Sequence, residues 1–268
     1  KNASLPIIIA SLLTRDKVQI KNIPNLSDVF TLLKLIKTLG SEYQLKNENN
    51  SSYKLNIQTK KIKNNIASYD LVRKMRASFW VLAPLILRYG EAKVSLPGGC
   101  AIGIRPINFY LSILKKMGAT IKIKDGYVQA SIKNNLKPIN YKLNFPSVGV
   151  THFFLMISSS IEGESIIRNA AMEPEIISLA KMLNKMGAKI TGYGTSKIIV
   201  NGCARLKGAN ITIPSDRIEA GTFALAVAAT GGKLKLKSIN IKEIDTIEKV
   251  LQNTDVEIKS SEKFVEII

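Results

Sequence analysis

Apolar residues recur with helical spacing in eight segments of the chain, and shorter apolar or alternating segments lie between them. We expect helices at 5–13, 27–39, 71–87, 107–117, 148–158, 175–186, 219–229 and 244–252. Strands are expected at 17–20, 93–96, 120–123, 127–131, 164–168, 189–191, 198–201 and 233–237. Asp125-Gly126, between two of these strands, is typical of a tight hairpin turn. The pattern therefore alternates helix and strand along the whole chain.

The alternation repeats at a nearly constant interval. Three expected helices end at Gly40, Gly118 and Gly187, which are 78 and 69 residues apart, and the fourth corresponding helix ends before Asp255. Such spacing predicts an α/β protein built from repeated helix-strand units. We expect residues 1–214 to hold three units in one domain and residues 215–268 to hold one unit of an incomplete second domain. The pattern does not decide whether the helices or the sheets face inward.

Composition narrows the class of protein. The chain has 268 residues, of which 46% are hydrophobic, and its most apolar segment, 77–87, contains Ser78 and Pro84 and is too short to span a bilayer. The apolar segment 5–13 is brief and lacks a convincing cleavage site, so we expect no secretory signal. We therefore expect a cytoplasmic protein without a membrane partner. Because the first residue is Lys rather than Met, we also expect the natural chain to be longer or processed at this end.

The formal net charge of +19 comes mostly from lysines scattered singly or in pairs. Because no nucleic-acid-binding motif accompanies the charge, we expect phosphate-bearing small ligands and no nucleic-acid partner. Cys100 and Cys203 are far apart and form no metal-ligand spacing with His152, so we expect no metal and no cofactor.

A loop around Cys100 is the main candidate for chemistry. Cys100 follows Pro97-Gly98-Gly99, and Arg105-Pro106 leads into the helix expected at 107–117. Proline suits the first turn of a helix, whose free N–H groups can hold an anion beside the Arg105 guanidinium. A thiol in such a loop is tunable, although an idle loop residue is an equally good interpretation.

Basic residues also lie at the ends of expected helices, where the repeat would bring them together: Lys1, Arg73, Arg76 and Arg217. Each could instead be an ordinary solvated charge. His152 lacks the partners of a catalytic triad and is expected to pack at a helix start. Asp216 and Glu219 are expected to cap a helix, and Trp80 to lie in the core.

Several motifs, in the same order along the chain, resemble the UDP-N-acetylglucosamine 1-carboxyvinyltransferase (MurA) family of enolpyruvyl transferases. The matching segments are Lys1-Asn2-Ala3, Arg73-Lys74-Met75-Arg76-Ala77-Ser78, Leu96-Pro97-Gly98-Gly99-Cys100, Arg105-Pro106, Pro146-Ser147-Val148-Gly149, Glu173-Pro174-Glu175-Ile176 and Asp216-Arg217-Ile218-Glu219. The segment around Cys100 is the most specific. The resemblance implies two domains of three units each, an inside-out α/β barrel with one domain inserted in the other.

The resemblance also implies an activity, the first committed step of peptidoglycan synthesis. The enolpyruvyl group of phosphoenolpyruvate passes to the 3′-hydroxyl of UDP-N-acetylglucosamine, and phosphate is released. Cys100 would be the general acid, and also the thiol that fosfomycin alkylates. The residues implied to bind the substrates are Lys1, Asn2, Arg76, Arg105, Pro106, Ile107, Asn108, Phe109, Ser147, Val148 and Gly149.

The chain departs from the family at three positions and in length. Asn108, Tyr110 and Phe145 stand where the family commonly has Asp, His and, in some members, Lys. The family's first strand and last two units are absent, so we expect this chain alone to bind weakly and not to turn over. A sister family that makes 5-enolpyruvylshikimate-3-phosphate and a non-enzymatic interaction module are the alternatives. The oligomeric state stays open.

Overall fold

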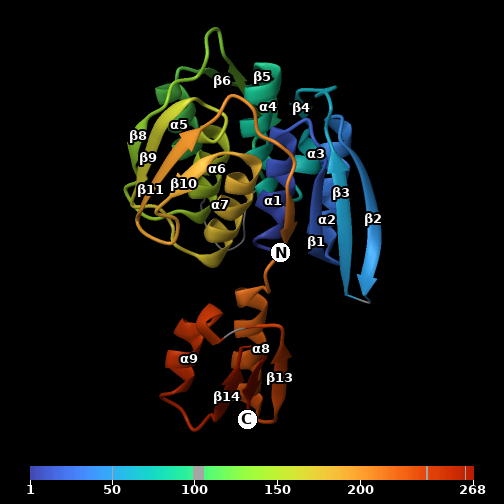
Figure 1. Ribbon diagram of the computed structural model, residues 1–268, viewed down its shortest axis with the longest axis vertical. Helices are drawn as coiled ribbons and strands as arrows, with labels where there is room; N and C mark the ends of the chain where they lie inside the picture. Colours follow the sequence, from blue (N-terminus) through green and yellow to red (C-terminus); the bar gives the residue numbers. More distant parts are fainter. Residues whose placement is uncertain (50, 99–105, 240, 263) are drawn as a thin grey trace. The chain divides into compact units, whose positions relative to one another are not determined.

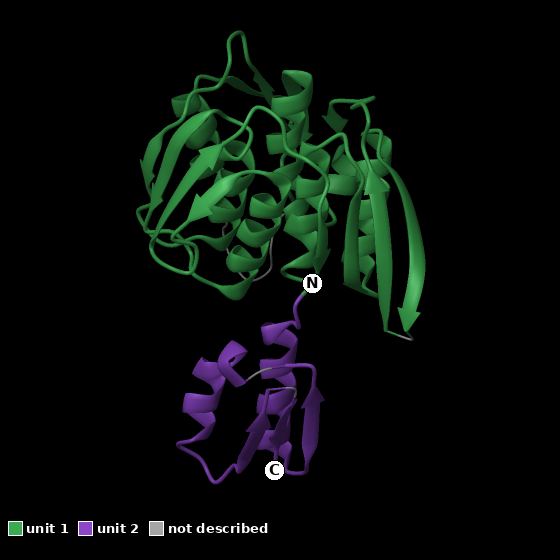
Figure 2. Cartoon of the chain, viewed as in Figure 1, with its two compact units in different colours: residues 1–213 green, residues 214–268 purple. Residues whose placement is uncertain are grey.

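The computed structural model describes residues 1–49, 51–98, 106–239, 241–262 and 264–268. The chain divides into two compact units, Lys1–Ile213 and Pro214–Ile268, coloured green and purple in Figure 2. Each unit has its own cluster of buried apolar side chains. They are therefore described separately.

The described part of unit 1 contains three four-stranded sheets with a common plan. In each sheet a long antiparallel hairpin pairs with a first strand, and a short strand adds to that first strand in parallel. The orders are β12-β1-β3-β2, β4-β5-β7-β6 and β8-β9-β11-β10. The strands are β1 Val18–Pro24, β2 Glu42–Asn49, β3 Ser52–Gln58, β4 Ile66–Ala67, β5 Glu91–Ser95, β6 Thr120–Lys124, β7 Tyr127–Ser131, β8 Asn140–Lys142, β9 Gly163–Arg168, β10 Lys189–Thr191, β11 Lys197–Gly202 and β12 Asn210–Thr212.

Helices fill the middle of unit 1, with the sheets around them (Figure 1). Every residue of α1 is buried, as is α6 from Val150 onward, which explains why these two segments are apolar on all sides. The helices are α1 Ser4–Ala10, α2 Ser27–Thr38, α3 Tyr69–Val72, α4 Leu82–Tyr89, α5 Asn108–Met117, α6 Val148–Ser158 and α7 Pro174–Met186, with 3-10 turns η1 Ser11–Leu13 and η2 Arg76–Val81. The sequence left open which layer faces inward; here the helices do.

The turn residues behave as the sequence predicts. Gly118 and Gly187 follow α5 and α7 in the left-handed region, with φ of 107° and 115°. Asp125 and Gly126 both have positive φ, 51° and 74°, and join β6 to β7 as a two-residue hairpin. These predictions are confirmed.

The single helix expected at 71–87 is wrong, because the segment is broken twice. α3 ends at Val72, and Met75 is extended, with φ −152° and ψ 118°, before η2 begins. Pro84 has no N–H to donate to the carbonyl four residues back, so it fits the first turn of α4 but not the middle of a long helix. The break places Arg76 at the start of η2 instead of inside a helix.

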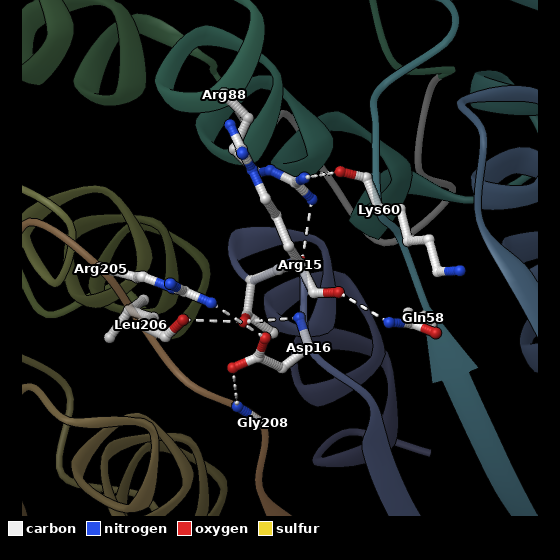
Figure 3. A network of polar contacts seen from close by, with 9 residues as sticks. Arg15, Asp16, Gln58, Lys60, Arg88, Arg205, Leu206 and Gly208 are labelled. Carbon is white, nitrogen blue, oxygen red and sulfur yellow. Dashed lines mark hydrogen bonds and ion pairs between the residues drawn. The ribbon is translucent and has the colours of Figure 1, made fainter.

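Polar contacts close unit 1 between its first and last segments (Figure 3). The Thr14 hydroxyl donates to the Leu206 carbonyl at 2.8 Å, and the Asp16 carboxylate accepts from the Gly208 N–H at 3.2 Å and pairs with Arg205 at 3.4 Å. The Arg88 guanidinium donates to the carbonyls of Leu12, Thr14 and Lys60 at 2.9 to 3.1 Å. The bonds of Thr14 and Asp16, together with the parallel β1–β12 pair, join residues about 190 positions apart, whereas Arg88 ties α4 to the first repeat.

Unit 2 is one smaller repeat. The sheet order is β13-β15-β14, with α8 and α9 packed on it through residues such as Ala224, Leu251 and Val265. The Asp216 carboxylate accepts from the N–H groups of Ile218 and Glu219, which confirms the predicted cap of α8. The elements are α8 Arg217–Thr230, β13 Leu234–Lys237, η3 Ile241–Glu243, α9 Asp245–Leu251, β14 Ile258–Ser261 and β15 Phe264–Ile267.

Candidate substrate site

The starts of α5 and α6 lie side by side in unit 1. The rings of Phe109, in the first turn of α5, and Phe145, just before α6, meet edge to face with their centroids 5.2 Å apart. Gly149 of α6 and Tyr110 of α5 are also neighbours. A Cβ placed on Gly149 would lie only 2.5 Å from the Tyr110 hydroxyl, so this close approach requires a glycine. Two segments that are about 40 residues apart in sequence therefore form one local surface.

The start of α6 is capped from within. The Ser147 side chain accepts from the Val150 N–H at 3.4 Å, and the Ser147 carbonyl accepts from the Thr151 hydroxyl at 2.8 Å. The Thr151 hydroxyl in turn accepts from the Ala171 N–H at 3.1 Å, which ties the helix to the segment before α7. The N–H groups of Val148 and Gly149 have no acceptor inside the helix, and such groups attract anions.

The start of α5 has no side-chain cap among the described residues. Ile107 is the N-cap, Pro106 precedes it, and Asn108 is exposed as the first helical residue. The first N–H groups of this helix, those of Asn108 and Phe109, thus have no partner within the helix. Cys100 and Arg105, the two most important predicted site residues, lie outside the described residues.

Beneath these helix starts is a cluster of rings from three elements. The Trp80 Nε1 group in η2 donates to the Tyr110 hydroxyl at 3.4 Å, and the Trp80 and His152 rings are 5.2 Å apart in a T-shaped contact. Tyr110 also meets Phe79 and Phe153 edge to face. The cluster fixes η2, α5 and α6 relative to one another, so it positions the residues at their starts.

The environment of His152 confirms that this residue packs in the core, as predicted. Its side chain is completely buried, and neither imidazole nitrogen has a hydrogen-bond partner of normal geometry among the described residues. Burial lowers the pKa of His152 to about 4, against a smaller opposing effect of Glu175. The imidazole is therefore neutral near pH 7 and supports the floor of the site without exchanging protons there.

The basic segment before η2 borders the entry to the Cys100 loop. A Cβ on Gly98 would collide with the Arg73 carbonyl oxygen, so the chain just after β5 runs against this backbone. Arg73 itself lies over the Tyr69 ring at 5.3 Å and is 4.0 Å from Asp70. Arg76, three residues on, is half-buried at the start of η2.

Lys1 and Asn2 precede α1, which packs against α2 and η2. The Lys1 ammonium is 2.6 Å from the Asp28 carboxylate in the first turn of α2. The sequence reasoning missed Asp28. An acidic residue in a first helical turn is a common signal, and nothing local in the sequence connects it with Lys1.

A polar hollow of about 590 Å³ lies on a different face, over the sheet β4-β5-β7-β6. Lys93, Gln129 and Lys122 are register neighbours that line it, whereas Val94 and Val128 on the opposite face are fully buried. The hollow is thus on the solvent side of the sheet, away from the helix starts.

The described residues contain no group of three or more His, Cys, Asp and Glu side chains arranged to hold a metal ion. None of their helices combines the length and apolar character needed to cross a membrane.

Comparison with known proteins identifies the family of the chain. The sequence model of the EPSP synthase (3-phosphoshikimate 1-carboxyvinyltransferase) family matches residues 1–268. The chain belongs to this family. The EPSP synthase family also accounts for the fold: an enolpyruvyl transferase NikO from Streptomyces tendae superposes with a TM-score of 0.85 at 17% identity, over 99% of this chain and 63% of that one. An EPSP synthase from Acinetobacter baumannii gives 0.73 at 19% identity, over 100% and 62%.

Within the EPSP synthase family, the curated relatives carry the name that the motifs suggested. UDP-N-acetylglucosamine 1-carboxyvinyltransferase of Bartonella henselae is 46% identical over 266 residues, 97% of this chain and 62% of the relative. The Brucella ovis protein of the same name is 44% identical over 273 residues, 100% of this chain and 64% of the relative. The predicted resemblance is confirmed, and the chain spans less than two thirds of these relatives' length.

Proposed function

We propose that the chain carries out its part of the UDP-N-acetylglucosamine 1-carboxyvinyltransferase reaction, binding the nucleotide sugar and supplying the thiol acid. The observation that carries the proposal is the identity of 44–47% to enzymes of that name across nearly the whole chain. Unit 1 then corresponds to an inserted domain of three repeats, an inside-out α/β barrel, and unit 2 to one repeat of the other domain.

The adjacent starts of α5 and α6 support the binding of a nucleoside diphosphate group. Four N–H groups, those of Asn108, Phe109, Val148 and Gly149, belong to first helical turns and lack intrahelical partners. Such groups stabilise negative charge without adding a flexible side chain. In this proposal Pro106 to Phe109 and Ser147 to Gly149 line the nucleotide sugar.

Phosphoenolpyruvate carries a carboxylate and a phosphate and needs cationic donors. Lys1, Asn2, Arg76 and Arg105 are the proposed ones. The Cys100 thiol would transfer its proton to the methylene carbon, which leaves C2 electron-poor, and the 3′-oxygen of the sugar would bond to C2 as the hydroxyl proton is lost. Cleavage of the bond between C2 and the phosphate oxygen would then release phosphate, which carries away the hydroxyl proton, and return of a methyl proton to the Cys100 thiolate would form the C=C bond of the enol ether.

A second candidate is 3-phosphoshikimate 1-carboxyvinyltransferase, because the matching family model carries that description. The two candidates differ in the acceptor. Isothermal titration of the 268-residue chain with UDP-N-acetylglucosamine and, separately, with shikimate 3-phosphate distinguishes them. We expect heat of binding only with the nucleotide sugar; binding of shikimate 3-phosphate alone would reverse the assignment.

The basic site has its own test. Arg76→Gln should weaken phosphoenolpyruvate binding by about tenfold or more, since a charge-assisted contact is lost. Arg168→Gln is the matched control, because Arg168 is an exposed arginine at the end of β9. Equal affinities of the two variants would remove Arg76 from the site.

The thiol can be tested without turnover. Fosfomycin, an epoxide, should add once to the wild-type chain and to Cys203→Ser, and not to Cys100→Ser, as measured by intact mass. Cys203 is a suitable control because it is half-buried and its thiol donates to the Arg205 carbonyl at 3.4 Å. Adduct formation on Cys203 alone would contradict the role of Cys100.

A further inference from the structure

We propose that the solvent face of the sheet β4-β5-β7-β6 binds a small phosphorylated sugar in its polar hollow. The hollow has a volume of about 590 Å³, which is within the range of small-molecule sites. It lies on the side of the sheet opposite to the buried Val94 and Val128, away from the starts of α5 and α6. The inference is therefore independent of the proposed function.

One row of side chains across the hollow is cationic. Lys93, Gln129 and Lys122 are register neighbours on β5, β7 and β6. Adjacent strands are about 4.8 Å apart, so the two lysines flank Gln129 with about 10 Å between their Cα atoms. Within the described part of the chain, neither ammonium forms an ion pair with a carboxylate. An anion between the two lysines, within reach of the Gln129 amide, would relieve their mutual repulsion.

The position of Lys93 distinguishes this row from an ordinary protected sheet edge. Edge strands commonly carry lysines that prevent association with another sheet, which accounts for Lys122 on β6. Lys93 is on the inner strand β5, where no edge needs protection. Its ammonium lies 4.8 Å from the centroid of the Tyr127 ring, which is in the next row along the strands, on the side away from Glu91. This contact keeps the charge of Lys93 apart from the one carboxylate on its own strand.

A second row across the hollow supplies groups for hydroxyls. Glu91, Ser131 and Thr120 are register neighbours on the same three strands, two residues from the cationic row. Residues two apart on a strand share a face and are about 7 Å apart. A carboxylate repels phosphate but accepts hydrogen bonds from sugar hydroxyls, and serine and threonine hydroxyls both donate and accept. A phosphate at the first row and a hydroxyl-bearing ring at the second are the two parts of a sugar phosphate.

The charge of the lining also favours an anionic ligand. The residues that line the hollow include three lysines, Lys93, Lys122 and Lys133, and one carboxylate, that of Glu91. The whole chain carries a formal net charge of +19, however, and so attracts anions in general. A test of this site therefore needs a control that removes the same charge elsewhere.

The experiment is a ligand-observed NMR titration of the 268-residue chain with glucose 6-phosphate and, separately, with inorganic phosphate. Glucose 6-phosphate should bind more tightly than inorganic phosphate. Lys93→Gln combined with Lys122→Gln should raise the Kd for glucose 6-phosphate about 3- to 30-fold, the loss expected for two exposed charge contacts. Glu91→Gln should reduce the preference for glucose 6-phosphate over phosphate, because it removes an acceptor for hydroxyls and a charge that repels phosphate.

Lys142→Gln combined with Lys189→Gln is the matched control, since both are exposed lysines of the sheet β8-β9-β11-β10 and the same charge is removed. The control should bind glucose 6-phosphate as the wild type does, and circular dichroism should show both double variants to be folded. An equal loss of affinity in the two double variants would mean that net charge alone attracts the ligand, and would overturn the inference. Equal affinities of the wild type for glucose 6-phosphate and inorganic phosphate, or no binding of either, would overturn it as well.

Discussion

Acidification should destabilise unit 1 through one residue, His152. The folded-state pKa is about 4 and the ordinary value is 6.5. Because the folded value is the lower one, the unfolded chain binds more protons between these two pH values. Stability contributed by the neutral imidazole is therefore complete above about pH 6.5 and is lost as the pH falls from 6.5 to 4.

The expected loss of unfolding free energy follows from the same two pKa values. Between pH 7 and pH 5 the loss is about 2 kcal/mol, and it levels off at about 3 kcal/mol below pH 4. His152→Leu removes the titrating group and two buried nitrogens without normal hydrogen bonds, so the variant should be at least as stable as wild type at pH 7. The difference in pH dependence between the two proteins isolates the imidazole from the carboxylates.

The assay is urea unfolding at pH 7 and pH 5, followed by the fluorescence of Trp80, the chain's one tryptophan, and by circular dichroism. A second measurement is direct: His152 is the one histidine, so in untagged protein its NMR signal needs no assignment, and its midpoint should be near 4. A midpoint near 6.5, or equal losses of stability in wild type and His152→Leu, would refute the reasoning.

Three other perturbations test separate features. Gly149→Ala should destabilise unit 1 by about 1–3 kcal/mol through its clash with the Tyr110 hydroxyl, and Tyr110→Phe should restore part of the loss in thermal unfolding. Arg88→Met should cost about 2–3 kcal/mol in urea unfolding, because three carbonyls lose a charged donor, whereas exposed Arg15→Met should cost little. Phe145→Lys should make nucleotide-sugar affinity fall more steeply with added salt than it does in wild type, as titrations at two ionic strengths would show.

The parts of the fold that depend on short-range chemistry were predictable from the sequence. Gly118 and Gly187 end helices in a conformation that favours glycine, and Asp125-Gly126 turns a hairpin, so each signal is complete within a few residues. The apolar run of α6 likewise predicted its bounds, Val148–Ser158. Local propensity and tertiary structure agree at these places.

The rest depends on contacts between segments that are distant in sequence. β4, β8 and β12 have two or three residues each, too few to show a period, and they become strands by pairing with a first strand of a different repeat. The break at Met75 separates a charged segment from the core-facing η2, and hydrophobic periodicity alone does not locate it. Pro84 was a sequence signal against one long helix, because proline breaks or kinks the interior of a helix.

In the candidate site, too, some residues were predictable from the sequence and some contacts were not. Residue types and motifs pointed to Ser147, Gly149 and the start of α5, but not to Asp28, whose partner Lys1 is 27 positions away. The contact between Phe109 and Phe145 was equally hidden, because it requires α5 and α6 to be packed side by side. Sequence signals identify chemical groups, whereas only the packing shows which groups meet.

Because β1 pairs with β12, strand pairing in unit 1 is cyclic, and only the chain connectivity makes one repeat the first. Each of the three sheets is completed by a strand from the preceding repeat, and for the first repeat the preceding one is the third. The loop that this pair closes is about 190 residues long, with a closure cost of about 5 kcal/mol on a logarithmic scale. Within unit 1 taken alone, a chain joined from the end of β12 to the segment before α1 and opened between two other repeats would keep all three of these parallel pairs, so its repeats form a closed ring.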